Sequence, residues 1–316
     1  MRYRGLLAIL LLSAALVLSL IISVTIGPTS IRLSSIFVDA TAYQIIFDIR
    51  LPRVIAAVLV GAALATAGSA MQALFRNPMA DPYIIGTSAG GSLGAVVSIV
   101  FLAGAGLPVF AFTGAFGATF LVYMIARSGG KVPVETLLLT GVALSMFLSA
   151  MLSFLMYNSG KSLQQIVFWL MGGFWTVSWN DVHIALLIPF GCLFIYLFAR
   201  DINIISLGDE DAVHLGVNVE QLKVLLLFVS SVLAGIAVAI AGAIGFIGLI
   251  TPHLMRIIVG PDHRVLVPAA ILAGGLILLW ADTFARTLGN EMPVGIITAF
   301  LGAPFFMFLL QRRIHA

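Results

Sequence analysis

Charged residues are scarce in this chain of 316 residues. It has 16 Lys and Arg and 13 Asp and Glu, together 9% of the sequence, whereas an ordinary soluble domain carries about 25%. A water-soluble fold of this length needs far more polar surface, so a soluble enzyme is excluded. The net charge of +3 is too small to favour a nucleic-acid partner, and the basic residues are better interpreted as topology signals.

Cysteine is rarer still, because Cys192 is the single one in the sequence. A disulfide within the chain is therefore excluded. Long soluble loops are also lacking. The two longest polar stretches, about 27–52 and 200–221, are shorter than the roughly 50 residues that a domain needs. We therefore predict one domain over 1–316, and any energy-supplying or ligand-capturing module must be a separate chain.

Apolar residues are abundant, at 61%, and 31 glycines accompany them. Small residues let membrane helices approach closely, and a helical span needs about 20 apolar residues. Long apolar runs without alternation argue against a membrane barrel. We predict an all-α polytopic membrane protein with about ten transmembrane helices, over residues 5–26, 53–74, 83–104, 108–127, 134–157, 182–199, 222–243, 244–259, 266–288 and 294–311.

The eighth predicted span differs from the others because it is short and contains Pro252. Proline disrupts the helix interior, so this segment is not expected to cross as a straight rod. Gly242, Gly245 and Gly248 precede that proline and indicate a broken helix. Broken helices at membrane depth line cavities or pack against other backbone, and both alternatives stay open.

Basic residues are distributed unevenly between the two sides that ten spans define. If both termini are cytoplasmic, eleven basic residues lie inside: Arg2, Arg4, Arg76, Arg127, Lys131, Arg200, Lys223, Arg256, Arg264, Arg312 and Arg313. Five lie outside: Arg32, Arg50, Arg53, Lys161 and Arg286. The positive-inside rule therefore favours cytoplasmic termini. The first apolar run is longer than a signal-peptide core, so we expect it to be retained as a span.

A serine in the third span gives one enzymatic hypothesis. Residues 86–90 match the G-x-S-x-G nucleophile pattern, and an intramembrane serine protease would pair Ser88 with His253. The alternative is that Gly86, Gly90 and Gly94 form a helix-packing face beside Ser88, which is the favoured interpretation. A third hypothesis is an ion-coupled secondary transporter, but few ionisable residues lie within the spans.

Asp282 and three arginines are predicted near the outer membrane edge. Asp282 lies four residues before Arg286 on one helical face, so a local ion pair accounts for it. Arg50, Arg53 and Arg286 suit docking to carboxylates of a partner if they are exposed, because the guanidinium group bonds bidentately. Anchoring to lipid headgroups is an equal alternative.

Residues 207–217 place three acids on the side where bases collect. Two glycines bracket about two helical turns, in which Ala212 and Leu215 are three residues apart. This pattern predicts a short cytoplasmic helix between spans six and seven, either available to pack into a partner's groove or a connector without a partner.

Several long motifs in order identify a resemblance over about residues 50–310. The sequence resembles the FecCD-type permease family, the membrane subunits of type II ABC importers for cobalamin, haem and ferric siderophores. The motifs are RLPR at 50–53, QALFRNPMADP at 72–82, GG at 172–173, LGDEDAVHLGV at 207–217, GAIGFIGLITPH at 242–253, GPDHR at 260–264, PVG at 293–295 and GAPF at 302–305.

The resemblance implies a homodimeric permease with the transport pathway on its two-fold axis, in the cell membrane. It implies two cytoplasmic ATPase subunits that carry ATP and Mg²⁺, an extracytoplasmic binding protein, and no cofactor or metal held by this chain. Ala89 replaces the Asn of some cobalamin transporters, which leaves the chelate open.

The resemblance also implies three sets of site residues. Coupling helices at about 206–218 would dock the ATPase through Leu207, Gly208, Asp209, Glu210, Ala212, Leu215 and Gly216. The binding protein would dock at Arg50, Arg53 and Arg286. The candidates for pathway lining and gating are Ser88, Thr140, Ser145, Pro293 and Pro304. The chain itself would have no catalytic residue.

Overall fold

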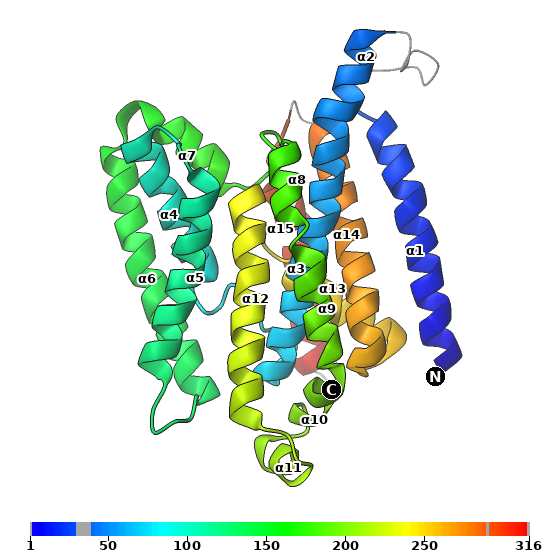
Figure 1. Cartoon of the computed structure of the whole chain (residues 1–316), viewed down its shortest axis with the longest axis vertical. Helices are drawn as coiled ribbons and strands as arrows, with labels where there is room; N and C mark the ends of the chain where they lie inside the picture. Colours follow the sequence, from blue (N-terminus) through cyan, green and yellow to red (C-terminus); the bar gives the residue numbers. More distant parts are fainter. Residues whose placement is uncertain (1, 30–38, 289–290, 315–316) are drawn as a thin grey trace.

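The computed structural model describes residues 2–29, 39–288 and 291–314, and these form a bundle of helices (Figure 1). The membrane-sized helices and their short companions are α1 (Arg2–Thr25), α2 (Ala40–Gln44), the π-helix η2 (Ile45–Arg50), α3 (Leu51–Leu74), α4 (Thr87–Leu102), α5 (Leu107–Ala126), α6 (Val134–Asn158), η3 (Gly160–Ser162), α7 (Leu163–Leu170), α8 (Trp179–Ala185), α9 (Ile188–Leu197), α10 (Ala199–Ile205), α11 (Asp209–His214), α12 (Val219–Ala241), α13 (Ile247–Val259), α14 (His263–Leu288) and α15 (Val294–Ile314).

Each of the ten predicted spans coincides with a helix or a pair of helices. Within the described residues, seven helical segments are long and apolar enough to cross a membrane, counting 40–74 and 179–197 as continuous segments and α15 over 294–307 alone. The third, eighth and tenth predicted spans are the shorter apolar helices α4, α13 and α15. The prediction of an all-α polytopic membrane protein is therefore confirmed.

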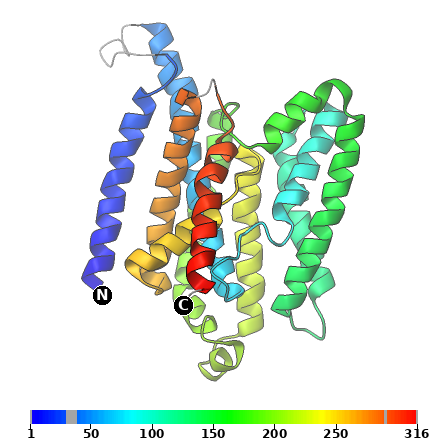
Figure 2. The same ribbon diagram turned by 180° about the vertical axis from the view of Figure 1, so that it is seen from behind.

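The centre of the bundle is α3, most of whose residues are buried. It packs against α14, α12, α13 and α9. A second group, α4 to α7, lies to one side and meets the centre where α5 packs on α12 (Figures 1 and 2). On the opposite side α1 packs on α14. This arrangement explains why α3 is buried almost all round while α1 and α6 keep apolar faces exposed.

Glycine contacts set the closest approaches between helices. A Cβ atom on Gly68 would collide with the carbonyl oxygen of Gly248 in α13, and a Cβ on Gly61 would collide with that of Gly274 in α14. Helices at such short separations require residues without side chains. In α4 the predicted packing face is confirmed for Gly90 and Gly94, which meet the backbone of α5.

The polypeptide between α12 and α13 is unwound, as the glycines and Pro252 predict. Gly242 ends α12 with φ 67°, and residues 242–246 are not helical. The 13 residues of α13 span only about 20 Å at 1.5 Å per residue, short of the roughly 30 Å hydrocarbon core. The break packs on other backbone, since the Gly173 N–H donates to the Ala241 carbonyl (2.8 Å). Phe246 also lines a cavity of about 200 Å³, so both interpretations of the break hold.

The two ends of the bundle differ in their elements. The start of α1, the end of α15 and α11 lie at one end, called here the α11 end (Figure 1). The opposite end, called the α2 end, carries α2 and α7. The sites described below divide between these two ends.

Candidate functional site

The short helix α11 projects from the α11 end between α10 and α12 (Figure 1). Three acids in its first turn favour the helix, because their negative charge interacts favourably with the partial positive charge at a helix N-terminus. Gly216 ends it with φ 82°, and the Val217 N–H donates to the Ala212 carbonyl (3.0 Å). This is a Schellman end, in which glycine adopts the left-handed conformation at no steric cost. The predicted short helix is confirmed.

The surface that α11 offers differs from the one expected from residue spacing. Ala212 is fully buried in the chain's own core, so it does not share an outward face with Leu215. The exposed apolar side chains are Leu207, Val213 and Leu215, at 67%, 61% and 60% exposure. Val213 was missed because the spacing of Ala212 and Leu215 cannot show which side of a six-residue helix faces the bundle.

An ion-pair network ties α11 to the bundle. The Lys223 Nζ in α12 lies 2.6 Å from the Asp209 Oδ2 and 3.2 Å from the Glu220 Oε1. Lys223 is 4% exposed, so its ammonium group needs these acids as partners. The Arg76 Nη2 lies 3.6 Å from the other Asp209 oxygen. Asp209 therefore joins α11 both to α12 and to the connector 75–86.

Arg76 holds an uncommon backbone conformation at the end of α3. Its φ is 47°, which places a non-glycine residue in the left-handed region at a cost of roughly 1 kcal/mol. The Arg76 N–H donates to Ala73 and the Asn77 N–H donates to Gln72, which makes a second Schellman end. This turn directs the connector back toward α4.

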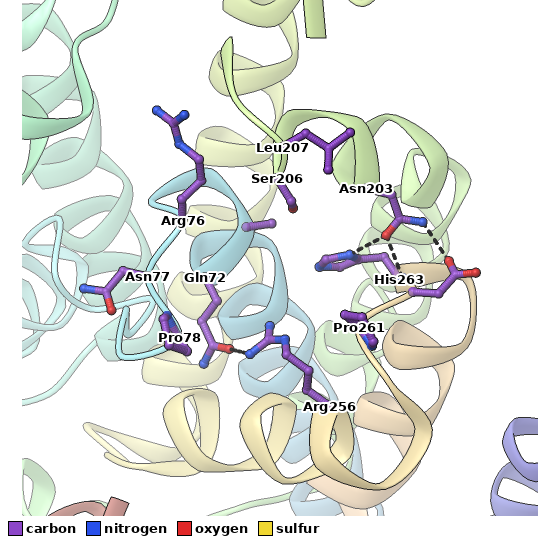
Figure 3. Close-up of a pocket in the computed structure, with 12 residues that line it drawn as sticks. Gln72, Arg76, Asn77, Pro78, Asn203, Ser206, Leu207, Arg256, Pro261 and His263 are labelled. Carbon is purple, nitrogen blue, oxygen red and sulfur yellow. Dashed lines mark hydrogen bonds between the residues drawn. The ribbon is translucent and has the colours of Figure 1, made fainter. Parts of the chain in front are cut away.

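A cavity of about 490 Å³ opens beside the base of α11 (Figure 3). Its walls come from the ends of α3, α10 and α13 and the start of α14, and it was not foreseen from the sequence. Asp262, in the connector before α14, contributes to the lining. Burial raises the pKa of Asp262, but hydrogen bonds from the Arg264 N–H (3.0 Å) and Asn203 Nδ2 (2.7 Å) outweigh it and hold that pKa below its ordinary value.

The arginines predicted at the outer edge lie at the α2 end and are buried. Arg53 is 4% exposed and faces Asp282, with its Nη2 2.9 Å from Oδ1 and its Nε 3.1 Å from Oδ2. Its Nη1 lies 2.6 Å from the Glu291 Oε2. The predicted local pair of Asp282 with Arg286 is wrong, because α3 supplies the partner across the helix interface. Sequence spacing along one helix cannot reveal such a contact.

Arg50 and Arg286 are likewise internal. Arg50 is 4% exposed and donates to the carbonyls of Val24 and Thr25 at the end of α1 and to that of Thr29 beyond it. Arg286 is 2% exposed and donates to the Ser23 hydroxyl (2.6 Å). Cations satisfy the last carbonyls of a helix well. The expectation that these arginines are exposed is therefore wrong in this structure, and their docking role stays a prediction.

The predicted pathway residues are spread over three helices. Ser88 is half-buried in the first turn of α4, and the Ser145 hydroxyl on α6 lies beside Gly86, just before Ser88. Thr140 is half-buried one turn earlier on α6. Pro293 is buried before α15, and Pro304 is exposed within it. Figure 2 shows α15 and α6 well apart in the bundle.

Ser88 and His253 do not form a catalytic pair. Within the described ranges, no hydrogen bond connects Ser88 with His253, and the His253 Nδ1 is buried without a partner. The glycines around Ser88 serve helix packing instead, as described for Gly90 and Gly94. Nothing here activates the serine as a nucleophile.

Residues 15–312 match the FecCD transport family. The chain belongs to this family.

Three characterised relatives extend along most of the chain. The cobalamin import system permease BtuC of Halobacterium salinarum is 49% identical over 87% of this chain and 76% of its own length. The hemin transport permease HmuU of Yersinia pestis is 41% identical over 92% and 91%. The Fe(3+)-citrate import permease YfmD of Bacillus subtilis is 39% identical over 87% and 84%.

A solved structure has the same fold. It is described as an inward-facing conformation of a metal-chelate type ABC transporter, and it superposes with a TM-score of 0.88 at 36% identity, covering 96% of this chain and 98% of that one. This FecCD protein is thus a permease subunit of an ABC importer and not an enzyme, and ATP hydrolysis belongs to a separate subunit. The protease and ion-coupled alternatives are not supported.

Proposed function

We propose that two copies of this FecCD chain form the import pathway for a metal chelate. ATPase subunits that bind ATP and Mg²⁺ dock at the α11 end, and an extracytoplasmic binding protein delivers the chelate at the α2 end. The relatives named for cobalamin, hemin and Fe(3+)-citrate support the substrate class. All three are metals held in organic ligands.

The separation of α6 from α15 supports the homodimer. Both helices carry predicted pathway residues but lie apart within one chain (Figure 2). Each also keeps large apolar side chains exposed, such as Leu139 at 73% and Met146 at 70% on α6, and Phe300 at 79% on α15. Lipid covers part of these faces, and a second copy brings α6 and α15 of different chains to a shared pathway.

The arrangement of the termini supports the orientation. The α11 end holds both ends of the described chain and the basic residues assigned to the inner side, including Arg76 and Arg256. The positive-inside rule then places this end in the cytoplasm and the protein in the cytoplasmic membrane. ATP is available on that side, which the ATPase subunits require.

The observation that carries the proposal is the exposed apolar face of α11. Leu207 and Leu215 are exposed on either side of α11, which Asp209 ties to α12. A bound ATPase subunit can therefore move α12 through α11. The remaining coupling residues have structural duties: Gly208 begins the helix with φ 146°, Gly216 ends it, Glu210 adds to its acidic first turn, and Ala212 seats it in the core.

Docking of the binding protein is proposed at the α2 end, near Arg50, Arg53 and Arg286. The three guanidinium groups concentrate positive charge there, although each also has an internal partner. Of the two carboxylate partners, Asp282 is buried and Glu291 is accessible, with its side chain 45% exposed. An acidic side chain of the binding protein could therefore take the place of Glu291 on Arg53.

Purification from the native membrane in mild detergent tests the proposal. We expect an ATPase subunit to co-purify and two permease copies per complex, measured by mass spectrometry and light scattering. Vesicles containing the complex should take up one of cobalamin, hemin or ferric citrate only with ATP. Leu215→Glu should abolish ATPase recovery, whereas Gln311→Glu, which adds the same charge at an exposed site on α15, should not. Uptake by the isolated chain without ATP would contradict the proposal.

A further inference from the structure

The cavity beside α11 is continuous with the proposed coupling surface. Ser206 and Leu207 line it, and α11 begins two residues after Leu207. Its other walls include the apolar side chains of Ala73, Pro78 and Pro261. A subunit seated on the exposed Leu207 and Leu215 therefore also covers this opening. At about 490 Å³, the cavity has room for a long side chain.

Arg256 brings a positive charge to this cavity without an acid to neutralise it. It is half-buried at the end of α13, and its Nη1 donates to the Gln72 Oε1 (2.9 Å). Gln72 is 3% exposed, and its Nε2 donates to the Leu249 carbonyl (2.9 Å), which keeps the amide oxygen toward Arg256. Across residues 2–29, 39–288 and 291–314, no carboxylate lies within 4.0 Å of Arg256. Its other N–H donors are available to a carboxylate, the partner that guanidinium binds most strongly.

His263 supplies a second group with an unmet hydrogen bond. Its ring Nδ1 lies 2.7 Å from the Asn203 Oδ1, and the Asn203 Nδ2 donates to Asp262, so the Asn203 oxygen faces the ring. An amide oxygen only accepts, so the Nδ1 carries the hydrogen. The Nε2 is then a lone pair in the neutral ring and an N–H donor in the charged ring.

That Nε2 is buried and makes no hydrogen bond of good geometry within the described chain, although the Ser69 backbone on α3 lies near the ring, and His263 is 4% exposed. Figure 3 shows the His263 ring and the Arg256 side chain reaching toward the enclosed space from different walls. A buried nitrogen without a partner is costly. A carboxyl group that reached this nitrogen could hydrogen-bond with it in either protonation state, as O–H donor to the neutral ring or as acceptor from the charged one.

We propose that this cavity receives an acidic side chain of the ATPase subunit that docks on α11. The inference rests on the proposed function and names the chemistry of that partner. The charge pattern agrees, because α11 is acidic at Asp209, Glu210 and Asp211 while the cavity beside it holds Arg256, Arg76 and His263. The one carboxylate among the described lining residues, Asp262, accepts hydrogen bonds from Asn203 and the Arg264 N–H. An ATPase surface that complements both features needs a basic groove for the acidic α11 and, next to it, an acidic side chain for the basic cavity.

Zero-length cross-linking tests the contact in the purified permease–ATPase complex. Arginine does not react with a carbodiimide, but Arg256→Lys introduces an amine that the reagent couples to a touching carboxylate. Lysine also keeps a donor for Gln72. We expect a peptide that links Lys at position 256 to an Asp or Glu of the ATPase subunit, identified by mass spectrometry. Arg264→Lys, exposed one residue beyond His263 and not lining the cavity, is the matched control and should give no such link.

Charge reversal provides the second measurement. Arg256→Glu should weaken ATPase binding by about tenfold or more, because like charges are then buried together. Reversing the cross-linked ATPase acid to lysine should restore binding. Normal ATPase binding by Arg256→Glu, or coupling of Lys at 256 only to acids of its own chain or to a lipid headgroup, would overturn the inference. Failure of the wild-type chain to retain any ATPase would instead overturn the proposed function.

Discussion

The two ends of this permease are held by ion pairs of different kinds. At the α2 end, Arg53 and Asp282 are 4% and 0% exposed and join the central helices α3 and α14. At the α11 end, the side chain of Asp209 is 39% exposed and bridges Lys223 and Arg76. Removing one partner of a buried pair is strongly destabilising. The Asp209 pairs are exposed on the acid side, and Lys223, which is buried, keeps Glu220 when Asp209 is changed, so they should contribute less. We therefore expect the α2 end to be the more rigid one, and the α11 end to be the one that moves if an ATPase subunit docks there.

Removing the acid of the buried pair should have the largest effect. Asp282→Ala leaves the Arg53 guanidinium buried with only the peripheral Glu291, so we expect a loss of about 3–5 kcal/mol in the free energy of unfolding. Thermal unfolding of the purified permease in detergent measures it. The double variant Arg53→Met with Asp282→Leu should recover most of the loss, because an apolar pair of similar size replaces both charges. An Asp282→Ala protein as stable as wild type would show that the two ends do not differ in this way.

The membrane helices were predictable because their signal is local. Each apolar run carries its own evidence of a span, and Gly242 with Pro252 marks the break before α13 at the correct place. The charged residues were placed less well, because their partners are remote in sequence. Arg53 and Asp282 are 229 residues apart, and no periodicity relates positions on different helices.

The candidate site shows the same division. The acids and bracketing glycines of 207–217 predict α11, yet the burial of Ala212 and the cavity around Arg256 depend on how α3, α10 and α13 meet. Only the assembled bundle brings those residues together. The sequence motifs were enough to predict the family, but the contacts of each side chain could be seen only in the structure.

Acidity should affect the connector 75–86 at the α11 end. Burial raises the pKa of Asp81 to about 6, outweighing the hydrogen bond it accepts from the Tyr83 N–H (2.8 Å). The folded chain then binds this proton more tightly than the unfolded chain, whose pKa is near 3.8. Stability should therefore rise as the pH falls from 7 to 5. Asp81→Asn keeps the acceptor oxygen and should gain about 1–2 kcal/mol at pH 7.5.

Unfolding of both proteins across pH 5 to 8 isolates this group, because every other titration is common to them. The stability difference between Asp81→Asn and wild type should shrink below pH 6. A difference that stays constant across this range would show that Asp81 does not titrate there. The connector 75–86 would then not contribute a pH-dependent difference in stability between the α11 end and the α2 end.

Asp209→Asn should change the free energy of unfolding least of these variants, yet it should have the clearest effect on transport. Asp209→Asn weakens an ion pair that is partly exposed, and Lys223 keeps Glu220 at 3.2 Å, so the loss should be below about 1 kcal/mol. Asp209→Asn should impair coupling more than folding, because Asp209 joins α11 to α12 and to Arg76 in the connector.

ATP hydrolysis by the Asp209→Asn complex should continue while ATP-driven uptake into vesicles falls severalfold. Glu210→Asn, which removes a charge from the same turn but from no ion pair within the described ranges, serves as the control and should transport normally. Equal losses in both variants would mean that α11 needs only its negative charge, and that movement at this end is carried by apolar contact alone.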